Sequence, residues 1–397
     1  MALADQALSG LSNFLTVVLM ARSADPDGFG RFVLVYAMFV AALGLARQLW
    51  GTRISLTASP GAAEEQARRV MAAALFVAPL AACVLAVPSL ALTGWVSLPV
   101  VLLLAAALPV VVVQDLGRYA AIAVGRPAVA LVSDLLWVSA VVAAYVVRPS
   151  LLVALTIWLA GALVALLAAL AGLRIAPSVG RAWAALRERH ATGEVTAGGY
   201  VAASLATYVT LGLATVTVGA AAAGAVRGAS TVMAPINTLF AFAGLAVLPV
   251  VFRTSPHERL RPVGRVSAAL VAASAVWGAV LLVLPAQTGE LLLGESWAGA
   301  RSVLPWTVVE YVALAAATGA VLGLQAHRQA RHLAVVLFSG SVFVVAAGLL
   351  AALLGDSAAA FAAGLAVATV LYAVLAWATL YRRRTLDPRS GEGSTAL

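Results

Sequence analysis

The sequence predicts an all-α integral membrane protein with about twelve transmembrane helices. Hydrophobic residues make up 63% of its 397 residues and charged residues only 10%, whereas soluble proteins contain about 25% charged residues. Apolar segments of helical length recur along almost the whole chain, and arginines concentrate in every second connection between them. A soluble chain of this composition would expose large apolar surfaces, so lipid is the expected solvent for most of the molecule.

Each expected span contains about 20 mostly apolar residues, the length that a helix needs to cross a bilayer. Three prolines, Pro79, Pro109 and Pro235, lie inside spans, where neighbouring helices can satisfy the carbonyl groups that a kink frees. The expected spans are residues 3–22, 32–51, 70–91, 97–117, 128–147, 150–173, 198–219, 226–250, 265–285, 302–325, 332–354 and 358–380.

The distribution of arginine gives these spans an orientation. All 25 basic residues are arginine, and twenty of them fall on the cytoplasmic side when the N-terminus is placed in the cytoplasm. The positive-inside rule therefore favours cytoplasmic N- and C-termini and an even number of spans. The same asymmetry accounts for the net charge of +9 without a nucleic-acid partner. The arginines expected outside are Arg22, Arg31, Arg148, Arg227 and Arg301.

The longest polar stretch, residues 174–197, divides the chain near its midpoint. Within it Val179, Trp183 and Leu186 follow helical spacing, with arginines around them. This pattern predicts either a short amphipathic helix on the inner leaflet or a solvated linker. The expected organisation is therefore an N-terminal six-helix lobe over residues 1–173 and a C-terminal six-helix lobe over residues 198–381. A basic, disordered cytoplasmic tail is expected over residues 382–397.

Two polar stripes relate the first half of the chain to the second. In the first and the seventh span, polar residues recur on one helical face. The two stripes are 195 residues apart. Arg31 and Arg227 are 196 residues apart, and so are Gln114 and Glu310, each of which follows a Leu-Pro pair a few residues earlier. The stripes contain Ser9, Ser12 and Asn13 in the first span and Ser204, Thr207 and Tyr208 in the seventh.

This repeat predicts an architecture. A unit of six spans leaves both copies in the same orientation, so the copies are expected to be parallel and related by an axis along the membrane normal. Two bundles whose polar stripes face each other would enclose a central cavity, as an alternating-access transporter requires. The six stripe residues are therefore candidates for lining that cavity, although small hydroxyl groups also stabilise contacts between membrane helices.

Arginines within or near the spans are a second group of candidates, because a charge inside a bilayer is costly and rarely kept without a function. Arg31 and Arg227 lie at the outer ends of the second and eighth spans, and Arg47 lies about one turn inside the inner end of the second. Each could bind an anion through paired charge-assisted hydrogen bonds. The alternative is that their side chains reach out to the nearest membrane interface.

Acidic residues in the fourth, fifth and tenth spans are the third group of candidate functional residues. Asp115 and Arg118 are spaced for an ion pair within one helix, and Asp134 could meet Arg118 or Arg126 across neighbouring helices. These residues are candidates for ion or proton coupling, with a structural ion-pair cluster as the alternative. Glu310 lies deeper in its span and is the main candidate for a cation or proton site.

The sequence contains no arrangement typical of catalysis or of a metal site. Its four histidines lie in expected loops or at span ends without the spacing of metal ligands, and no glycine-rich phosphate-binding motif occurs. The outer loops are too short for the sizeable acidic or arginine-rich loop of a membrane-embedded polysaccharide polymerase. We therefore expect a transporter and not an enzyme, with no metal and no cofactor.

Four stretches of the chain carry the motifs of a known group of transporters. They run from Asp5 to Phe14 and from Phe29 to Tyr36 in the first half, and from Ala225 to Asn237 and from Gly294 to Pro305 in the second. Their residues resemble those of polysaccharide-export flippases in the multidrug/oligosaccharidyl-lipid/polysaccharide (MOP) flippase superfamily. The resemblance covers most of the chain and is more specific for the superfamily than for one branch of it.

The resemblance implies a fold like that of the MATE transporters, with two six-helix lobes around a V-shaped cavity. It implies translocation of a polyprenyl-pyrophosphate-linked oligosaccharide from the inner to the outer leaflet of a bacterial cytoplasmic membrane. The nearest counterparts of the cavity arginines of related lipid II flippases are Arg22, Arg47 and Arg227, and Asn237 joins the candidates for the cavity. The implied partners are the lipid-linked substrate, the bilayer, and a glycan polymerase or glycosyltransferases.

Two other functions fit the same features. One is a cation-coupled antiporter of small molecules or drugs from the same superfamily, and the other is a membrane-embedded polysaccharide polymerase. Loss of surface glycan on removal of the protein would favour the flippase, whereas increased drug sensitivity would favour the antiporter.

Overall fold

The chain folds into helices throughout the part that the computed structural model describes. This part comprises residues 2–55, 57, 59–177, 180, 182–187, 191–240, 243, 258–326, 330–355 and 357–384. Eleven of the twelve expected spans fall on helices there, and the remaining one, 226–250, is helical over 226–232 and 234–240 and lies partly outside the described residues. Ten helices within the described residues are long and apolar enough to cross a membrane. The all-α membrane fold predicted from the sequence is thus confirmed.

The first half of the chain supplies six span helices and one short helix. Three of the spans begin with a proline at the first helical position, at Pro26, Pro60 and Pro127. Proline is favoured there because its missing N–H would have had no partner in the helix. The helices are α1 (Ala2–Arg22), α2 (Pro26–Ala46), α3 (Thr52–Ser55), α4 (Pro60–Thr93), α5 (Leu98–Ala123), α6 (Pro127–Val147) and α7 (Leu151–Leu173).

The second half supplies the other six spans. Helix α14 is its centre and packs against α10, α12 and α16, while α15 packs against α9 and α16. The helices are α9 (Ala191–Thr217), α10 (Ala220–Val232), α12 (Leu260–Leu282), α13 (Ala286–Leu293), α14 (Ser296–Ala326), α15 (Ala330–Leu354) and α16 (Ala358–Arg384).

Two helices depart from the expected uninterrupted spans. Helix α10 ends at Val232, and the chain makes a turn at Met233 before it continues as a helix over residues 234–240. The break precedes Pro235, whose ring restricts the residues before it and removes a backbone donor. Helix α2 passes into a π-helical turn over Arg47–Gly51, a widening of the helix that is frequent at functional sites.

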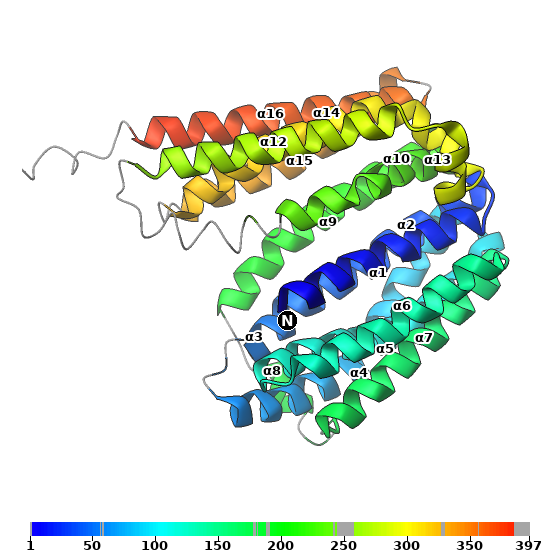
Figure 1. The fold of residues 1–397 in the computed structure, drawn as a ribbon, viewed down its shortest axis with the longest axis vertical. Coiled ribbons are helices and arrows are strands. Elements are labelled where there is room, and N and C mark those ends of the chain that lie inside the picture. The colour runs from blue at the N-terminus through cyan, green and yellow to red at the C-terminus, as the bar shows by residue number, and fades with distance from the viewer. Residues whose placement is uncertain are drawn as a thin grey trace, which may run out of the picture.

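The two groups of helices form two lobes that converge at one end of the molecule. Helices α4 to α7 lie on one side and α12 to α16 on the other, with α1, α2, α9 and α10 between them (Figure 1). The lobes approach each other at the end where α13 lies and diverge toward the opposite end (Figure 1). Contacts between α2 and α10, and between α1 and α13, join them. The converging end is called the closed end below.

At the closed end, the backbones of α2 and α10 approach each other closely. Gly30 of α2 packs against the backbone carbonyl of Ala220, and a side chain at position 30 would collide with it. Asp27 accepts a hydrogen bond from the backbone N–H of Ala221 at 3.2 Å, at the start of α10. A negative charge is favourable at a helix N-terminus, where backbone donors lack partners. The glycine and the aspartate therefore let the two lobes meet here without an intervening side chain.

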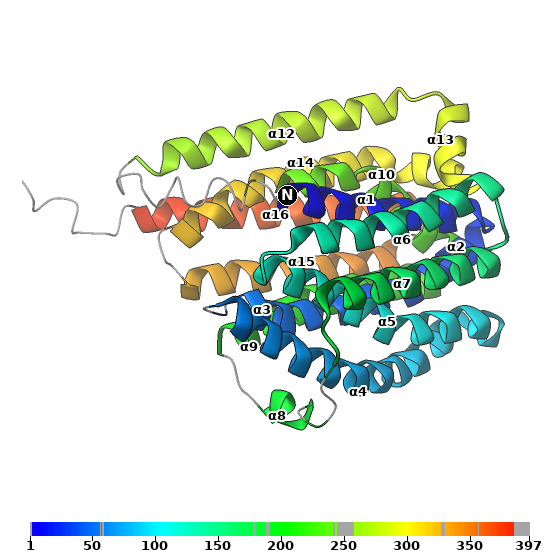
Figure 2. The ribbon, with the colours of Figure 1, turned by 60° about the horizontal axis from the view of Figure 1, so that its bottom comes forward.

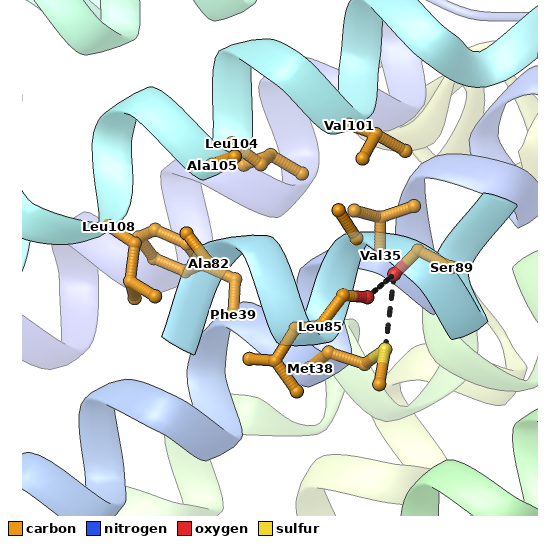
Figure 3. A pocket seen from close by; sticks show the side chains of 11 residues that line it. Val35, Met38, Phe39, Ala82, Leu85, Ser89, Val101, Leu104, Ala105 and Leu108 are labelled. Atoms are coloured by element: carbon orange, nitrogen blue, oxygen red, sulfur yellow. Dashed lines mark hydrogen bonds between the residues drawn. The ribbon is translucent and has the colours of Figure 1, made fainter. Parts of the chain in front are cut away.

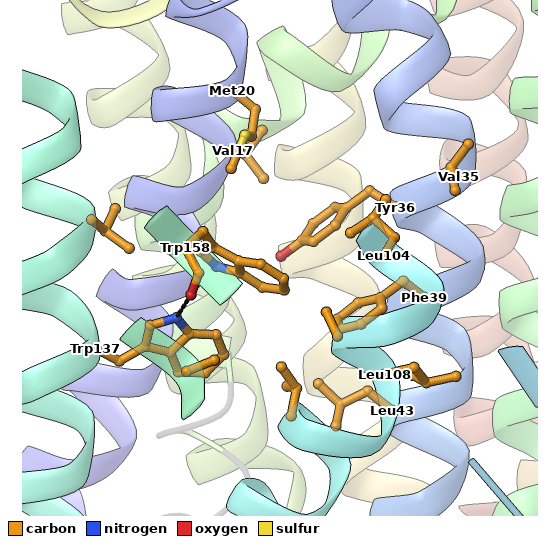
Figure 4. Close-up of a cluster of buried hydrophobic side chains, with 14 of the residues drawn as sticks. Val17, Met20, Val35, Tyr36, Phe39, Leu43, Leu104, Leu108, Trp137 and Trp158 are labelled. Carbon is orange, nitrogen blue, oxygen red and sulfur yellow. Dashed lines mark hydrogen bonds between the residues drawn. The ribbon is translucent and has the colours of Figure 1, made fainter. Parts of the chain in front are cut away.

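A series of aromatic rings stabilises the N-terminal lobe beside the region between the lobes. Tyr36 and Phe39 of α2 stack with ring centroids 5.8 Å apart, and Phe39 meets the edge of Trp158 of α7 at 5.6 Å. Trp158 lies 5.4 Å from Trp137 of α6 and accepts a hydrogen bond from its indole N–H at 3.1 Å. Figure 4 shows these rings between α1, α2 and α7. Aromatic pairs in these geometries add to the stability that burial provides.

A second apolar contact, between α2, α4 and α5, is shown in Figure 3. Its lining contains one polar side chain, Ser89, whose hydroxyl donates to the carbonyl of Leu85 at 2.8 Å and lies 3.1 Å from the sulfur of Met38. The hydroxyl is thus satisfied within its own helix. This pocket is a packing feature between apolar helices.

The linker between the lobes contains the short helix α8 (Ala182–Arg187), which packs beneath α4 (Figure 2). Arg53 donates to the backbone carbonyl of Ala185 at 3.0 Å, and Arg187 lies over the ring of Trp183 at 5.0 Å. Val179 of the predicted amphipathic pattern lies outside the described residues. The placement of α8 on the inner leaflet stays a prediction, as do the lobe boundaries, and α16 extends as a helix to Arg384, past the predicted start of the tail.

Candidate functional site

A cavity of about 280 Å³ lies between the two lobes. Helices α1 and α2 line it from the N-terminal lobe, and α10, the helical turns after it and α14 line it from the C-terminal lobe. Its lining consists of Gly10, Asn13, Phe14, Val17, Tyr36, Val40, Leu43, Arg47, Arg227, Ser230, Thr231, Ala234, Asn237, Thr238 and Tyr311.

Two arginines from opposite lobes are the only charged residues in this lining among those that the structure describes. Arg47 comes from the end of α2 and Arg227 from the middle of α10. Arg227 is half-buried and has no acidic partner among the residues that the structure describes. Because the described part of the lining contains these two arginines and no carboxylate, its charged groups are positive. Such a site attracts anions, and guanidinium groups bind phosphate oxygens in pairs.

Amide and hydroxyl groups add hydrogen-bonding capacity to the side of the cavity formed by the C-terminal lobe. The amide of Asn237 donates to the hydroxyl of Tyr311 at 3.3 Å, and that hydroxyl donates to the backbone carbonyl of Ser230 at 3.2 Å. Tyr311 also stacks on Phe240 with ring centroids 6.4 Å apart. These contacts join α14 to α10 and orient polar groups beside Arg227.

A buried network of charges lies behind Arg47 in the N-terminal lobe. Arg47 binds Asp115 of α5 through two hydrogen bonds, of 2.7 and 2.9 Å. Asp115 also pairs with Arg118 at 3.1 Å, and Arg118 pairs with Asp134 of α6 at 3.1 Å. Gln114 donates to Asp134 at 3.1 Å. Asp115 thus pairs with Arg118, as their spacing in the sequence suggested. Of the two arginines that were expected near Asp134, it is Arg118 that pairs with it.

The predicted stripe of the first span faces these two sites in part. Asn13 lines the cavity and also the smaller pocket around the charge network, which Ser12 lines as well. The side chain of Ser9 lies outside the part of the chain that the structure describes. The adjacent Thr16 donates to the carbonyl of Ser12 at 2.8 Å and accepts from the indole of Trp158 at 3.0 Å.

The predicted stripe of the seventh span, on α9, lies elsewhere. Ser204, Thr207 and Tyr208 are absent from the lining of the cavity, which α10 and α14 supply from that lobe. Thr207 is exposed, and its hydroxyl donates to the carbonyl of Ala203 at 3.1 Å. The repeat therefore relates α1 and α9 in sequence, but their polar faces have different surroundings. A transport role for the α9 stripe stays a prediction.

The remaining candidates lie outside the cavity lining. Arg31 is half-buried near the closed end. Arg22, the cavity candidate suggested by resemblance, instead donates to Tyr145 of α6 at 2.7 Å and to the carbonyl of Leu291 in α13. It thereby joins the lobes at the closed end. Glu310 is half-buried beside Tyr311 and has no ionic partner among the described residues.

Some residues of the cavity lining were not predicted from the sequence. Ser230, Thr231 and Thr238 share one helical face with Arg227, at steps of three, four and eleven residues, so helical periodicity about Arg227 would have indicated them. Tyr36 and Tyr311 had no such signal. Their hydroxyls border the cavity because α2 and α14 happen to face each other across it.

Within the described residues, no group of three or more histidine, cysteine, aspartate or glutamate side chains gathers in a way that could hold a metal ion. Asp115 and Asp134 of the N-terminal lobe face arginines. The arginines, amides and hydroxyl groups of the cavity lining can bind anions and form hydrogen bonds.

The helices and the cavity define a polytopic membrane protein of two helical lobes with a site between them. No family model and no curated protein matches the sequence. Solved structures match its fold over nearly the full length. A MATE-family multidrug resistance transporter of the MOP superfamily, in an inward-facing conformation, has a TM-score of 0.68 at 13% identity, covering 97% of this chain and 96% of its own.

Two further structures share the fold. The lipid II flippase MurJ, in an inward closed conformation, has a TM-score of 0.62 at 10% identity, covering 98% of this chain and 88% of its own. A MOP superfamily transporter from Pyrococcus furiosus has a TM-score of 0.55 at 13% identity, covering 96% and 93%. The chain therefore has the fold of MATE transporters and MurJ. At these identities the likeness defines the fold.

Proposed function

We propose that this protein is a membrane transporter of the MOP type that moves a polyprenyl-pyrophosphate-linked oligosaccharide from the inner to the outer leaflet. The observation that carries the proposal is the pair of arginines, Arg47 and Arg227, which opposite lobes present to one cavity. Two lobes that each hold one cation can close around a single dianionic group. Movement of the lobes about that group would then carry it across the membrane.

The charge of the cavity favours an anionic substrate over a cationic one. A cationic drug would be repelled by the two arginines and would need a carboxylate in the cavity to offset this repulsion and its desolvation. The described part of the lining offers aromatic rings but no carboxylate, and Glu310 lies outside it. We therefore rank the cation-coupled drug antiporter second. The polymerase ranks below it, because no arrangement of nucleophile and base occurs in the cavity lining.

The size of the cavity fits the head group of such a lipid. Sites for small molecules measure about 300–1,000 Å³, and this cavity is near the lower limit with its 280 Å³. It would hold a pyrophosphate and the sugar next to it, while further sugars extend to where the lobes diverge. The polyprenyl tail would stay in the surrounding lipid, where burying it costs nothing.

The distribution of the arginines supports the proposed orientation in the membrane, and the direction of transport and the location are part of the proposal. Placing most of the arginines in the cytoplasm puts the closed end outside and the diverging ends of the lobes inside. In this orientation a bacterial cytoplasmic-membrane protein would receive its substrate from glycosyltransferases on the inner side. It would deliver the lipid-linked glycan to a polymerase on the outer side.

Translocation in proteoliposomes tests the proposal. A fluorescent polyprenyl-pyrophosphate disaccharide is incorporated, and a membrane-impermeant reductant then quenches the fluorophores that reach the outer leaflet. We expect the wild-type protein to accelerate quenching and Arg227→Ala to slow it by about tenfold or more, because a buried charge-assisted contact is lost. Arg301→Ala is the matched control, since Arg301 is an exposed arginine of the same lobe outside the cavity lining.

The two functions predict opposite results in this assay. Failure of the wild-type protein to move the pyrophosphate lipid, with transport of a small cationic dye instead, would replace the flippase by the antiporter. Equal rates for Arg227→Ala and Arg301→Ala would show that the cavity arginine is not the anion site.

A further inference from the structure

The charge network in the N-terminal lobe has an internal order that the cavity alone does not explain. Four side chains alternate in sign, from Arg47 through Asp115 and Arg118 to Asp134, with contacts of 2.7, 3.1 and 3.1 Å. Two positive and two negative charges make the chain neutral. It begins at the cavity and ends inside the lobe, between α5 and α6.

Only the first member of the network is accessible from the cavity. The side chain of Arg47 is 31% exposed, whereas those of Asp115, Arg118 and Asp134 are 4%, 9% and 3% exposed. Arg47 lines both the cavity and the smaller pocket that holds the other three residues. An anion in the cavity can thus reach Arg47 but not the residues behind it.

Asp115 can release Arg47 without becoming an isolated charge. It accepts from Arg47 through both carboxylate oxygens and also pairs with Arg118. Removing one partner from a buried ion pair is costly when the other charge is left alone. Here Arg118 would remain on Asp115, so the cost of moving Arg47 away is reduced. Arg227, in contrast, would not have to break an ion pair before binding an anion, because no acidic side chain among the described residues pairs with it.

We propose that Asp115 is an internal competitor of the substrate, which holds Arg47 while the cavity is empty and yields it to the substrate's phosphate oxygens. This inference rests on the proposed function and deepens it. Arg227 provides a permanent attraction for the pyrophosphate, and Arg47 provides a second contact whose strength Asp115 limits. When the lobes open on the other side, the return of Arg47 to Asp115 displaces the anion and helps its release.

Competition by Asp115 makes a prediction that a purely structural ion pair does not. If Asp115 only stabilised the fold, its removal would weaken binding or leave it unchanged. If Asp115 competes with the substrate, removing its charge should tighten substrate binding, because Arg47 becomes available to the ligand. Turnover should fall at the same time, because release becomes slower. Affinity and rate would therefore change in opposite directions.

The test measures binding of geranyl pyrophosphate to the purified full-length protein by titration calorimetry. We expect Asp115→Asn to bind it about tenfold more tightly than the wild-type protein. Asp134→Asn is the matched control: it removes the same charge from the same network, at the end that pairs with Arg118. We expect it to change the affinity by less than about twofold. In the proteoliposome assay Asp115→Asn should lower both the substrate concentration for half-maximal rate and the maximal rate.

The possible results separate this inference from the proposed function. If neither the wild-type protein nor Asp115→Asn binds the pyrophosphate, both ideas fail. If the wild-type protein binds geranyl pyrophosphate and the Arg227→Ala variant does not, the proposed function stands. In that case, equal or weaker binding by Asp115→Asn, or the same increase for both aspartate variants, overturns the competitor.

A measurement on the unchanged protein covers the case in which Asp115→Asn does not fold. A structure of the wild-type protein with bound geranyl pyrophosphate should place the Arg47 guanidinium on phosphate oxygens and leave Asp115 with Arg118. If Arg47 keeps both of its hydrogen bonds to Asp115 in the loaded protein, the inference is wrong.

Discussion

The two lobes of this protein keep charges inside the membrane in different ways. In the N-terminal lobe, Arg47, Asp115, Arg118 and Asp134 lie on three helices and neutralise one another at ion-pair distance. In the spans of the C-terminal lobe, Arg227 has no such partner among the described residues. A charge that is buried and paired within its own lobe contributes to structure, whereas one that lacks such a partner is available for a ligand at once, and Arg47, paired but exposed to the cavity, lies between these cases.

This difference between the lobes also separates stability from function. Replacing Arg118, in the interior of the paired network, should mainly affect folding, because it leaves a buried charge uncompensated. Replacing an unpaired charge should mainly affect transport, because no internal contact is lost. The following variants test the contrast, from the largest expected effect to the smallest.

Arg118→Met should reduce the free energy of unfolding by about 3–5 kcal/mol, the usual cost of breaking a buried ion pair. Arg118 is the one member of the network that pairs with both aspartates. Equilibrium unfolding in mixed detergent micelles measures the effect. The double variant Arg118→Met/Asp134→Asn should recover much of the loss, since it removes the orphaned carboxylate. Wild-type stability of Arg118→Met would show that the network is not structural.

Arg47→Ala should reduce the free energy of unfolding by a smaller amount, about 1–2 kcal/mol, because it removes hydrogen bonds to a charged group that keeps another partner. Asp115 retains Arg118, and the Arg47 side chain is partly solvated already. The same unfolding measurement applies, with Arg227→Ala as the control from the other lobe. A loss as large as that of Arg118→Met would mean that Arg118 does not hold Asp115 alone.

Glu310→Gln should change the free energy of unfolding by less than about 1 kcal/mol, since the exchange removes no ion pair and keeps the size of the side chain. If Glu310 couples transport to an ion or proton gradient, the variant should still flip substrate but lose the stimulation by an imposed gradient. Proteoliposomes with and without a pH gradient measure this. A stability loss of several kcal/mol would reveal a structural partner of Glu310.

Much of the fold could be predicted because the bilayer restricts what a chain can do. Span lengths follow from apolar length, and two six-helix lobes were expected from the repeat of polar stripes and arginines. The even number of spans, which the arginine distribution favours, stays a prediction. The break before Pro235 and the π-helical turn at Arg47 could not be predicted in the same way. Both depend on how neighbouring helices satisfy backbone groups, which apolar length does not specify.

The candidate site was predicted only in part. Arg47, Arg227, Asn13 and Asn237 line the cavity as expected, because charged or amide groups within a span rarely face lipid. The stripe around Thr207 does not line it. Threonine can satisfy its own hydroxyl by donating to the carbonyl four residues earlier, as Thr207 does, so its position carries little information about the cavity.

The sequence by itself determined that this chain belongs in lipid and that it contains about twelve apolar segments long enough to cross a bilayer, and it predicts that the arginines lie mainly on the cytoplasmic side. These properties depend on composition and spacing, because the bilayer imposes them on any chain. Only the tertiary structure decided that Arg47 pairs with Asp115, whereas Arg227 has no acidic partner among the described residues. Helix rotation and packing bring Asp115 to Arg47 and leave Arg227 facing the cavity, and these contacts join residues far apart along the chain.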